Sequence, residues 1–96
     1  MKVKIKTKEE IKKYPNGYGI TDFYCPKDAK YIFVPEMFKF CGKIFEAKKI
    51  IGDSYLLYDK NGNEIKGKNY PNLYWEEWMF DEAKEVDENG NYLLFY

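Results

Sequence analysis

The sequence contains no arginine, histidine or glutamine, and only one serine, Ser54. Arginine supplies the planar fork that binds phosphate and carboxylate groups bidentately, and histidine is the usual acid or base near neutral pH. Without histidine, neither Ser54 nor a cysteine has the imidazole that normally activates such a nucleophile. We therefore expect that the protein is not an enzyme.

Cysteine is also scarce. Cys25 and Cys41 lack the CxxC spacing and the neighbouring histidine of a metal site, so we expect reduced, buried thiols. Residues 59–63 place oxygen ligands at alternate positions, as a calcium loop does. However, Glu64 stands where that loop needs glycine, and Tyr70 stands where it needs a bidentate glutamate. We predict a hairpin turn there, and neither a metal nor a cofactor in the protein.

Long apolar runs are missing as well. No window approaches the roughly 18 apolar residues of a membrane-spanning helix, and the N-terminus lacks the apolar region of a secretion signal. The expected location is therefore the cytoplasm. Sixteen lysines balance sixteen acidic residues, which favours neither nucleic acid nor an anionic membrane as partner. The charge is unevenly distributed, because residues 1–75 hold 15 Lys and 9 acids, whereas residues 76–96 hold 1 Lys and 7 acids.

Aromatic residues, in contrast, are abundant. The 96 residues, which we expect to form one domain over 1–96, include 7 Phe, 10 Tyr and 2 Trp. A chain of this length has one small core, which should not hide all of these rings. Tyrosine and tryptophan that stay on a surface are the residue types enriched in binding hot spots. The composition therefore favours a binding role.

Local patterns in the first third of the chain predict short elements. Apolar residues alternate with lysines over residues 2–6, which indicates an edge strand protected by lysines. Thr7 and Glu10 have the spacing of a capping box, so we expect a short helix that continues to about Tyr14. The apolar run at residues 31–34 is typical of a core strand.

The middle of the chain predicts a helix followed by a β-meander. Proline at the first position and glycine just past the end indicate a helix over residues 35–41. We expect strands over residues 43–51, with Ile51 on the buried face, and over residues 54–59. The Asn61-Gly62 pair that follows tolerates the positive φ angles of a tight turn.

The last quarter of the chain is rich in aromatic and acidic residues. Apolar residues at helical spacing predict an amphipathic helix that begins near Trp75. A hairpin turn at residues 87–91 and a strand at residues 92–96 are expected to follow. The whole pattern indicates a mainly β (α+β) fold: a small, strongly bent antiparallel sheet or barrel with two or three short helices.

We place the candidate binding surface in this aromatic and acidic stretch. Four rings would form an apolar centre, and three carboxylates would form a charged rim. The predicted binding residues are Tyr70, Tyr74, Trp75, Glu76, Glu77, Trp78 and Asp81. The alternative is that both tryptophans belong to the core.

Several segments carry a resemblance to known proteins: residues 33–37 (FVPEM), 41–43 (CGK), 45–47 (FEA) and 74–80 (YWEEWMF). Together they resemble a pattern in small proteins of bacteriophages and prophages from AT-rich bacteria. The resemblance covers about residues 30–82. It implies an SH3-like barrel with short helical turns after the two aromatic-led segments. Residues 30–82 would form the barrel core, with residues 1–17 and 83–96 as decorations.

Three functions follow as hypotheses. The first is a phage-encoded module that sterically blocks a host defence or regulatory protein in the host cytoplasm. The acidic residues 76–88 would steer it towards a basic surface. The second is a sponge for a small nucleotide signal, in which aromatic rings stack on the base and lysines contact the phosphate. The third is a single-stranded nucleic-acid binder, which the zero net charge makes the weakest of the three.

Overall fold

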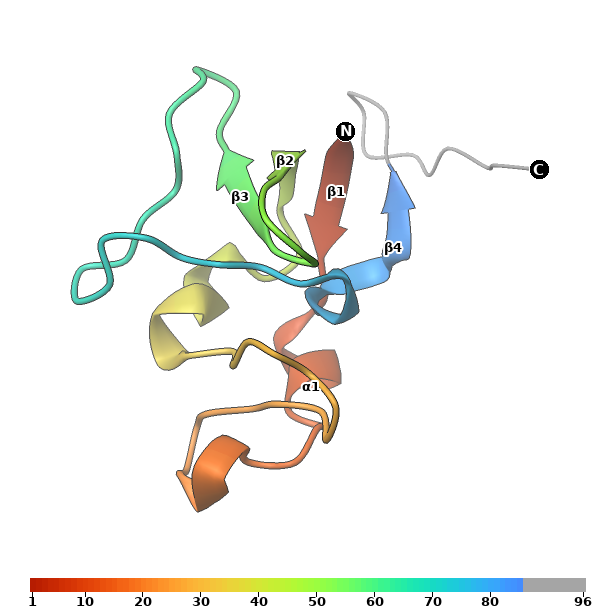
Figure 1. Ribbon diagram of the computed structural model, residues 1–96, viewed down its shortest axis with the longest axis vertical. Helices are drawn as coiled ribbons and strands as arrows, with labels where there is room; N and C mark the ends of the chain where they lie inside the picture. The colour runs from red at the N-terminus through yellow and green to blue at the C-terminus, as the bar shows by residue number, and fades with distance from the viewer. Residues whose placement is uncertain (86–96) are drawn as a thin grey trace.

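A four-stranded antiparallel sheet with the order β3-β2-β1-β4 is the centre of the fold (Figure 1). The computed structural model describes residues 1–85, with side chains placed for residues 1–81. The segment between β1 and β2 lies beneath the sheet in Figure 1 and carries most of the helical turns. The strands are β1 (Lys2–Ile5), β2 (Ile44–Lys49), β3 (Tyr55–Tyr58) and β4 (Phe80–Glu85).

The first strand lies in the middle of the sheet, so the prediction of an edge strand is wrong. Val3 pairs with Phe45 of β2, and Ile5 pairs with Phe80 of β4. The alternation itself is confirmed, because Val3 and Ile5 are fully buried. An alternating pattern predicts which face of a strand is buried, but not how many strands flank it. The N-terminal strand is thus part of the sheet, not a decoration of it.

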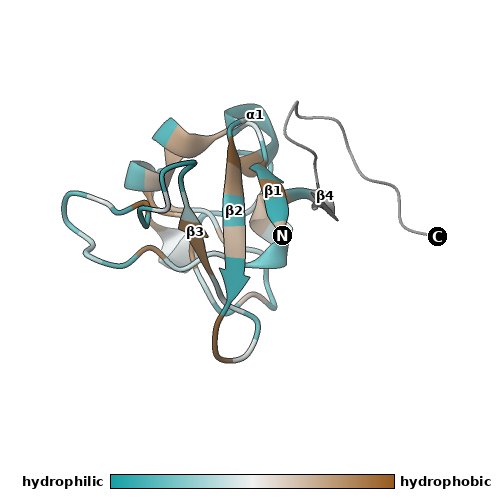
Figure 2. Ribbon diagram, turned by 90° about the horizontal axis from the view of Figure 1, so that it is seen from above, coloured by the Kyte–Doolittle hydropathy of each residue, from teal (hydrophilic) through white to brown (hydrophobic). Residues whose placement is uncertain are grey.

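The predicted β2–β3 meander is confirmed. Ala47 pairs with Leu57, and both side chains are buried on the same face. The alternation of apolar and polar residues along β1 and β2 is visible in Figure 2. One residue differs from the prediction: Ile51 is 92% exposed. It lies beyond the last strand residue, in the turn where Ile50 N–H donates to the Ser54 carbonyl at 2.9 Å.

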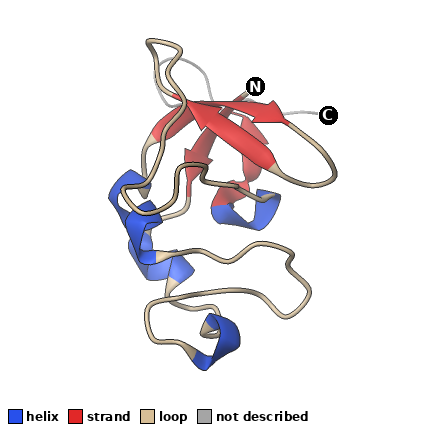
Figure 3. Cartoon of the chain, turned by 60° about the vertical axis from the view of Figure 1, so that its left-hand side comes forward, coloured by secondary structure: helices blue, strands red, loops and turns tan. Residues whose placement is uncertain are grey.

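The helices are short and lie on one side of the sheet (Figure 3). In α1 (Lys8–Ile11), the Thr7 side chain accepts from Glu10 N–H and the Glu10 carboxylate accepts from Thr7 N–H. The predicted capping box is therefore confirmed, although the helix ends before Tyr14. The other helical turns are 3₁₀ helices: η1 (Gly17–Gly19), η2 (Pro35–Phe40) and η3 (Glu77–Met79).

The aromatic-led segment 31–34 is extended but is not a regular strand. Phe33 alone forms an isolated bridge, with Tyr24. The helix predicted to follow is present as η2, whose first residue is Pro35. Its Met37 is buried, and the sulfur atom of Met37 accepts from Val34 N–H at 3.3 Å.

The prediction of a helix that begins near Trp75 is wrong. The backbone of Trp75 is extended and exchanges both hydrogen bonds with Tyr55, at 2.8 and 3.0 Å. The single turn η3 follows, and β4 begins directly at Phe80. Pairing with β1 and β3 thus overrides the helical periodicity. The predicted turn at 87–91 and strand at 92–96 lie outside the described residues.

The prediction of a mainly β (α+β) fold is confirmed. Within residues 1–85 the sheet is open, with β3 and β4 at its two edges. Its inner face packs against the helical turns, and Phe33, Trp75 and Phe80 are the largest buried side chains. None of the helices described for residues 1–85 has the length and apolar composition that crossing a membrane requires.

Candidate functional site

An apolar groove lies between the extended segment at residues 31–34 and the segment at residues 70–74. Three rings line it, those of Tyr31, Tyr70 and Tyr74, and we call it the tyrosine groove. Its volume is about 140 Å³, and its other lining residues are apolar except for Asn72. The Tyr31 and Tyr74 rings lie 5.7 Å apart between centroids and are inclined by 30°. Tyr70 and Tyr74 are each 40% exposed, so the groove is open to a partner.

Hydrogen bonds at both ends hold Tyr31 in place. Oε1 of Glu76 accepts from the backbone N–H groups of Lys30, at 3.0 Å, and Tyr31, at 2.7 Å. The Tyr31 hydroxyl donates to Ser54 Oγ at 3.2 Å, and the buried Ser54 in turn donates to the Ile51 carbonyl at 2.7 Å. The ring that forms one wall of the groove is therefore ordered before any partner arrives.

A second carboxylate holds the loop that carries Tyr70. Oε1 of Glu36 accepts from Asn69 N–H at 2.8 Å. Gly67 N–H donates to the Tyr70 carbonyl at 3.1 Å. A Cβ atom at Gly67 would collide with Oε2 of Glu36, so a side chain at this position would push the carboxylate aside. Glu36 and Glu76 thus fix opposite walls of the groove.

The structure divides the predicted aromatic residues between two environments. Tyr70 and Tyr74 come together in the groove, as part of the predicted surface. Trp75 does not: it is fully buried, so its assignment to a binding surface needs correcting. Its ring makes edge contacts with Phe33, at 5.9 Å, and Phe40, at 6.1 Å. Trp75 is buried because its backbone pairs with Tyr55 of β3, which places the indole ring among the core rings.

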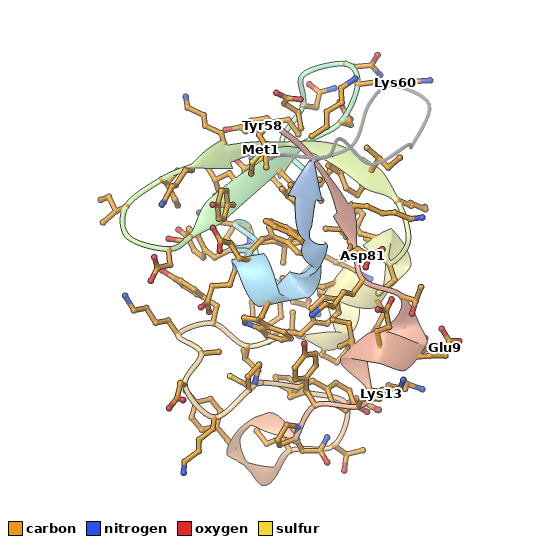
Figure 4. The ribbon with its side chains drawn as sticks, turned by 90° about the vertical axis from the view of Figure 1, so that its right-hand side faces the viewer. Met1, Glu9, Lys13, Tyr58, Lys60 and Asp81 are labelled. Carbon is orange, nitrogen blue, oxygen red and sulfur yellow. The ribbon has the colours of Figure 1, made fainter. Side chains whose placement is uncertain are left out.

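Trp78 and Asp81 lie apart from the groove. Trp78 is half-buried and packs edge-on against Tyr14, with centroids 4.9 Å apart. Asp81 is half-buried on β4, beside β1 (Figure 4). Neither residue lines the tyrosine groove. The seven predicted residues therefore do not form one surface.

The two adjacent acids of the prediction form hydrogen bonds within the fold. Glu76 binds two backbone N–H groups, as described above. Glu77 accepts from the Tyr55 hydroxyl at 2.9 Å. The pKa of Tyr55 is raised, first because the phenol is buried and then because the Glu77 carboxylate favours the protonated hydroxyl. Glu76 therefore supports the Tyr31 wall and is not part of a loose acidic rim.

The sequence prediction missed Tyr31, which forms one wall of the groove. Alternation gives no signal for it, because it places Tyr31 on the same side of the segment as Phe33, two residues later. Phe33 is fully buried, whereas Tyr31 is half-buried and reaches the surface. Glu36 was missed as well, and no local pattern predicts its bond to Asn69, which lies 33 residues further along the chain.

A second groove of about 570 Å³ lies at one end of the sheet and is lined in part by Lys2, Tyr58 and Lys60. Figure 4 shows Met1, Tyr58 and Lys60 close to this end. Two acidic residues, Glu46 and Asp59, also line it, and both carboxylates already have partners within the fold. Glu46 pairs with the N-terminal ammonium group at 2.8 Å, and Asp59 accepts from two backbone N–H groups of its own turn.

The two cysteines are free thiols, and both are half-buried. Burial raises the pKa of Cys25 and raises that of Cys41 to about 11. Both are therefore protonated at neutral pH. Across the part of the chain that the structure describes, no cluster of three acidic or cysteine residues could hold a metal ion.

No protein-family model, curated protein or solved structure matches the chain.

Proposed function

We propose that the protein is a binding module that captures another protein through the tyrosine groove. The observation that carries this proposal is an open apolar groove whose aromatic walls are held by hydrogen bonds from the fold. Tyrosine supplies a large contact area and has few side-chain torsions to order on binding. Walls that are already ordered lower the entropic cost of binding.

The size of the groove favours a protein partner. A cavity of about 150 Å³ accepts a single benzene ring, whereas pockets for small-molecule ligands span about 300–1,000 Å³. The tyrosine groove, at about 140 Å³, has room for one apolar side chain. A single inserted side chain surrounded by weaker contacts is the usual arrangement at a protein–protein hot spot.

A role without catalysis is part of the proposal. Both thiols have a raised pKa and are neutral at pH 7, whereas a nucleophilic cysteine needs a lowered one. Following the resemblance to small phage proteins, we propose that the partner is a host protein in the cytoplasm and that binding blocks it sterically. The SH3-like character of the sheet belongs to the same proposal, supported by the antiparallel β2–β3 meander and by a helical turn after each aromatic-led segment.

A selection of random short peptides on the immobilised protein tests the groove. We expect the selected peptides to share one large apolar residue. Their binding should be lost with Tyr74→Ala and kept with Tyr18→Ala, because Tyr18 is 91% exposed and does not line the groove. Equal binding by the two variants would contradict the proposal.

The second groove favours a nucleotide signal as the second candidate ligand. Its volume of about 570 Å³ lies in the range of ligand pockets, and it combines Tyr58 with two lysines, Lys2 and Lys60. A nucleotide bound there would raise the melting temperature, with a stabilisation that grows as the logarithm of its concentration over its dissociation constant. A panel of cyclic and linear nucleotides that leaves the melting temperature unchanged would exclude this candidate.

A further inference from the structure

We infer that the segment captured by the tyrosine groove is an acidic peptide, in which one apolar side chain is flanked by carboxylates. This inference rests on the proposed function, because it specifies the partner of the same groove. It follows from the charges around the groove, which differ in sign from those expected for a surface built on the acidic residues 76–88.

Three lysines, which we call the rim lysines, lie in or next to the segments that form the groove, although none of them lines it. Lys66 and Lys68 flank Gly67, whose N–H donates to the carbonyl of Tyr70 at 3.1 Å. These two lysines therefore belong to the loop that carries one wall. Lys30 precedes Tyr31 on the opposite wall. All three lysine residues are exposed.

Two of the nearby acids, Glu36 and Glu76, are half-buried and form hydrogen bonds within the fold. Oε1 of Glu36 binds Asn69 N–H, and its Oε2 is buried against Gly67. Oε1 of Glu76 accepts from two backbone N–H groups on the other wall. The two carboxylates that order the groove are thus engaged within the fold, whereas the rim lysines are exposed.

Only one rim lysine has an acidic partner among residues 1–81. Lys30 pairs with Asp53 at 3.5 Å, and both side chains are about two-thirds exposed, at 65% and 64%. An exposed pair of this kind is weak and is screened by salt. No ion pair is formed by Lys66 or Lys68 within that range. The groove thus combines an apolar centre with two exposed, unpaired lysines in the loop that carries one wall, which favours an acidic segment over a basic one.

A peptide fits this groove better than a nucleic acid does. Lysines can contact phosphates, but a base stacked in the groove would also need hydrogen-bond partners for its polar edge. Asn72 is the one lining residue with an amide side chain, and the Tyr31 hydroxyl already binds Ser54. An aliphatic or phenyl side chain needs no such partners.

Fluorescence anisotropy with a matched peptide set tests the inference on the full chain. Three peptides share one central Phe in a Gly-Ser frame, which is flanked by Glu, by Ser or by Lys, and a fourth has Glu flanks with Ser in place of Phe. We expect the Glu-flanked Phe peptide to bind roughly tenfold tighter than the Ser-flanked one, with the advantage shrinking at high salt. The Lys-flanked peptide and the peptide without Phe should bind weakest.

A charge-reversed variant locates the effect. The double variant Lys66→Glu/Lys68→Glu should lose the preference for Glu flanks and gain one for Lys flanks. The matched control Lys12→Glu/Lys13→Glu changes two exposed lysines near α1 and should behave as the wild type. Equal binding of all Phe peptides, unchanged in the double variant, would overturn the acidic partner while leaving the proposed groove intact. If no Phe peptide binds at any flank charge, the proposed function fails with it.

An oligothymidylate competitor separates the two classes of polyanion. We expect it to leave the bound Glu-flanked peptide in place. Displacement that depends on Lys66 and Lys68, together with equal binding of peptides with and without Phe, would assign the site to nucleic acid and overturn the peptide.

Discussion

The tyrosine groove and the aromatic core receive their rings from the same two segments of the chain. Residues 31–33 supply Tyr31 to the groove and Phe33 to the core, and residues 74–75 supply Tyr74 to the groove and Trp75 to the core. Tyr74 is 40% exposed, whereas the adjacent Trp75 is fully buried. Aromatic content alone therefore does not identify a binding surface. At residues 74 and 75, the side of the segment on which each ring lies decides its environment.

The two environments are also stabilised differently. The core rings are held by contacts with other rings, such as the contacts of Trp75 with Phe33 and with Phe40. The groove is held mainly by the carboxylates of Glu36 and Glu76 on backbone N–H groups. Removing a core ring should thus cost folding, and removing a groove ring should cost binding.

Substituting Trp75 tests the core side of this comparison with the largest expected effect. Trp75→Ala removes a fully buried ring and should lower the free energy of unfolding by about 3–5 kcal/mol. Tyr74→Ala, one residue earlier, removes a half-exposed ring and its contact with Tyr31 and should lower it by only about 0.5–1.5 kcal/mol. Urea denaturation followed by circular dichroism measures both values.

Trp75→Phe sharpens the same test. The indole N–H of Trp75 is buried and forms no hydrogen bond within the described residues, so phenylalanine loses ring volume but no bond. We expect less than half the cost of Trp75→Ala. A Trp75→Ala variant as stable as Tyr74→Ala would show that the two rings do not differ as described.

Substituting the two supporting carboxylates tests the groove side. Glu76→Ala and Glu36→Ala each remove an acceptor of backbone N–H groups, which should cost about 1–2 kcal/mol, below the core effect. For a domain of this size that corresponds to roughly 4–8 °C in melting temperature per kcal/mol. Scanning calorimetry measures the shift, and Asp28→Ala, an exposed acid, is the matched control.

Both carboxylate variants should also weaken peptide capture, because each releases one wall of the groove. Unchanged capture by Glu76→Ala would mean that the order of Tyr31 does not matter for binding. In that case Glu76 would stabilise the fold without contributing to peptide binding.

Alkaline titration gives the smallest expected effect. The pKa of Tyr55 in the folded protein is raised above the unfolded value of about 10. A raised pKa stabilises the fold fully below the unfolded pKa, and this contribution is lost as the pH rises through the folded pKa. Stability should therefore fall above about pH 10, and Tyr55→Phe should flatten this part of the profile, as measured by urea denaturation across pH. A slope identical in the variant would assign the loss to other groups.

Predictions from sequence succeeded where neighbouring residues decide the outcome. The capping box at Thr7 and Glu10 forms as expected, and Gly62 adopts the positive φ predicted for its turn, at 82°. The mainly β class and the β2–β3 meander also follow from local alternation. In the candidate site, Tyr70 and Tyr74 were predicted together because they are close in the chain.

Predictions failed where distant segments compete. The helical spacing after Trp75 was real, but Tyr55 draws that backbone into a bridge. Ile51 fits an alternating pattern, yet the strand ends before it. Tyr31 and Glu36 could not be assigned to the site with Tyr70, because the contacts that join them span more than 30 residues.

The amino-acid sequence by itself determined much of the local geometry of this protein: the turn at Gly62, the capped first helix and the buried faces of β1 and β2. These depend on backbone preferences and on the spacing of apolar side chains, which act over a few residues. Only the tertiary structure decided that β1 is central, that Trp75 is core and that three tyrosines meet in one groove. Long-range pairing and two half-buried, hydrogen-bonded carboxylates set these positions, and their partners lie far apart in the chain.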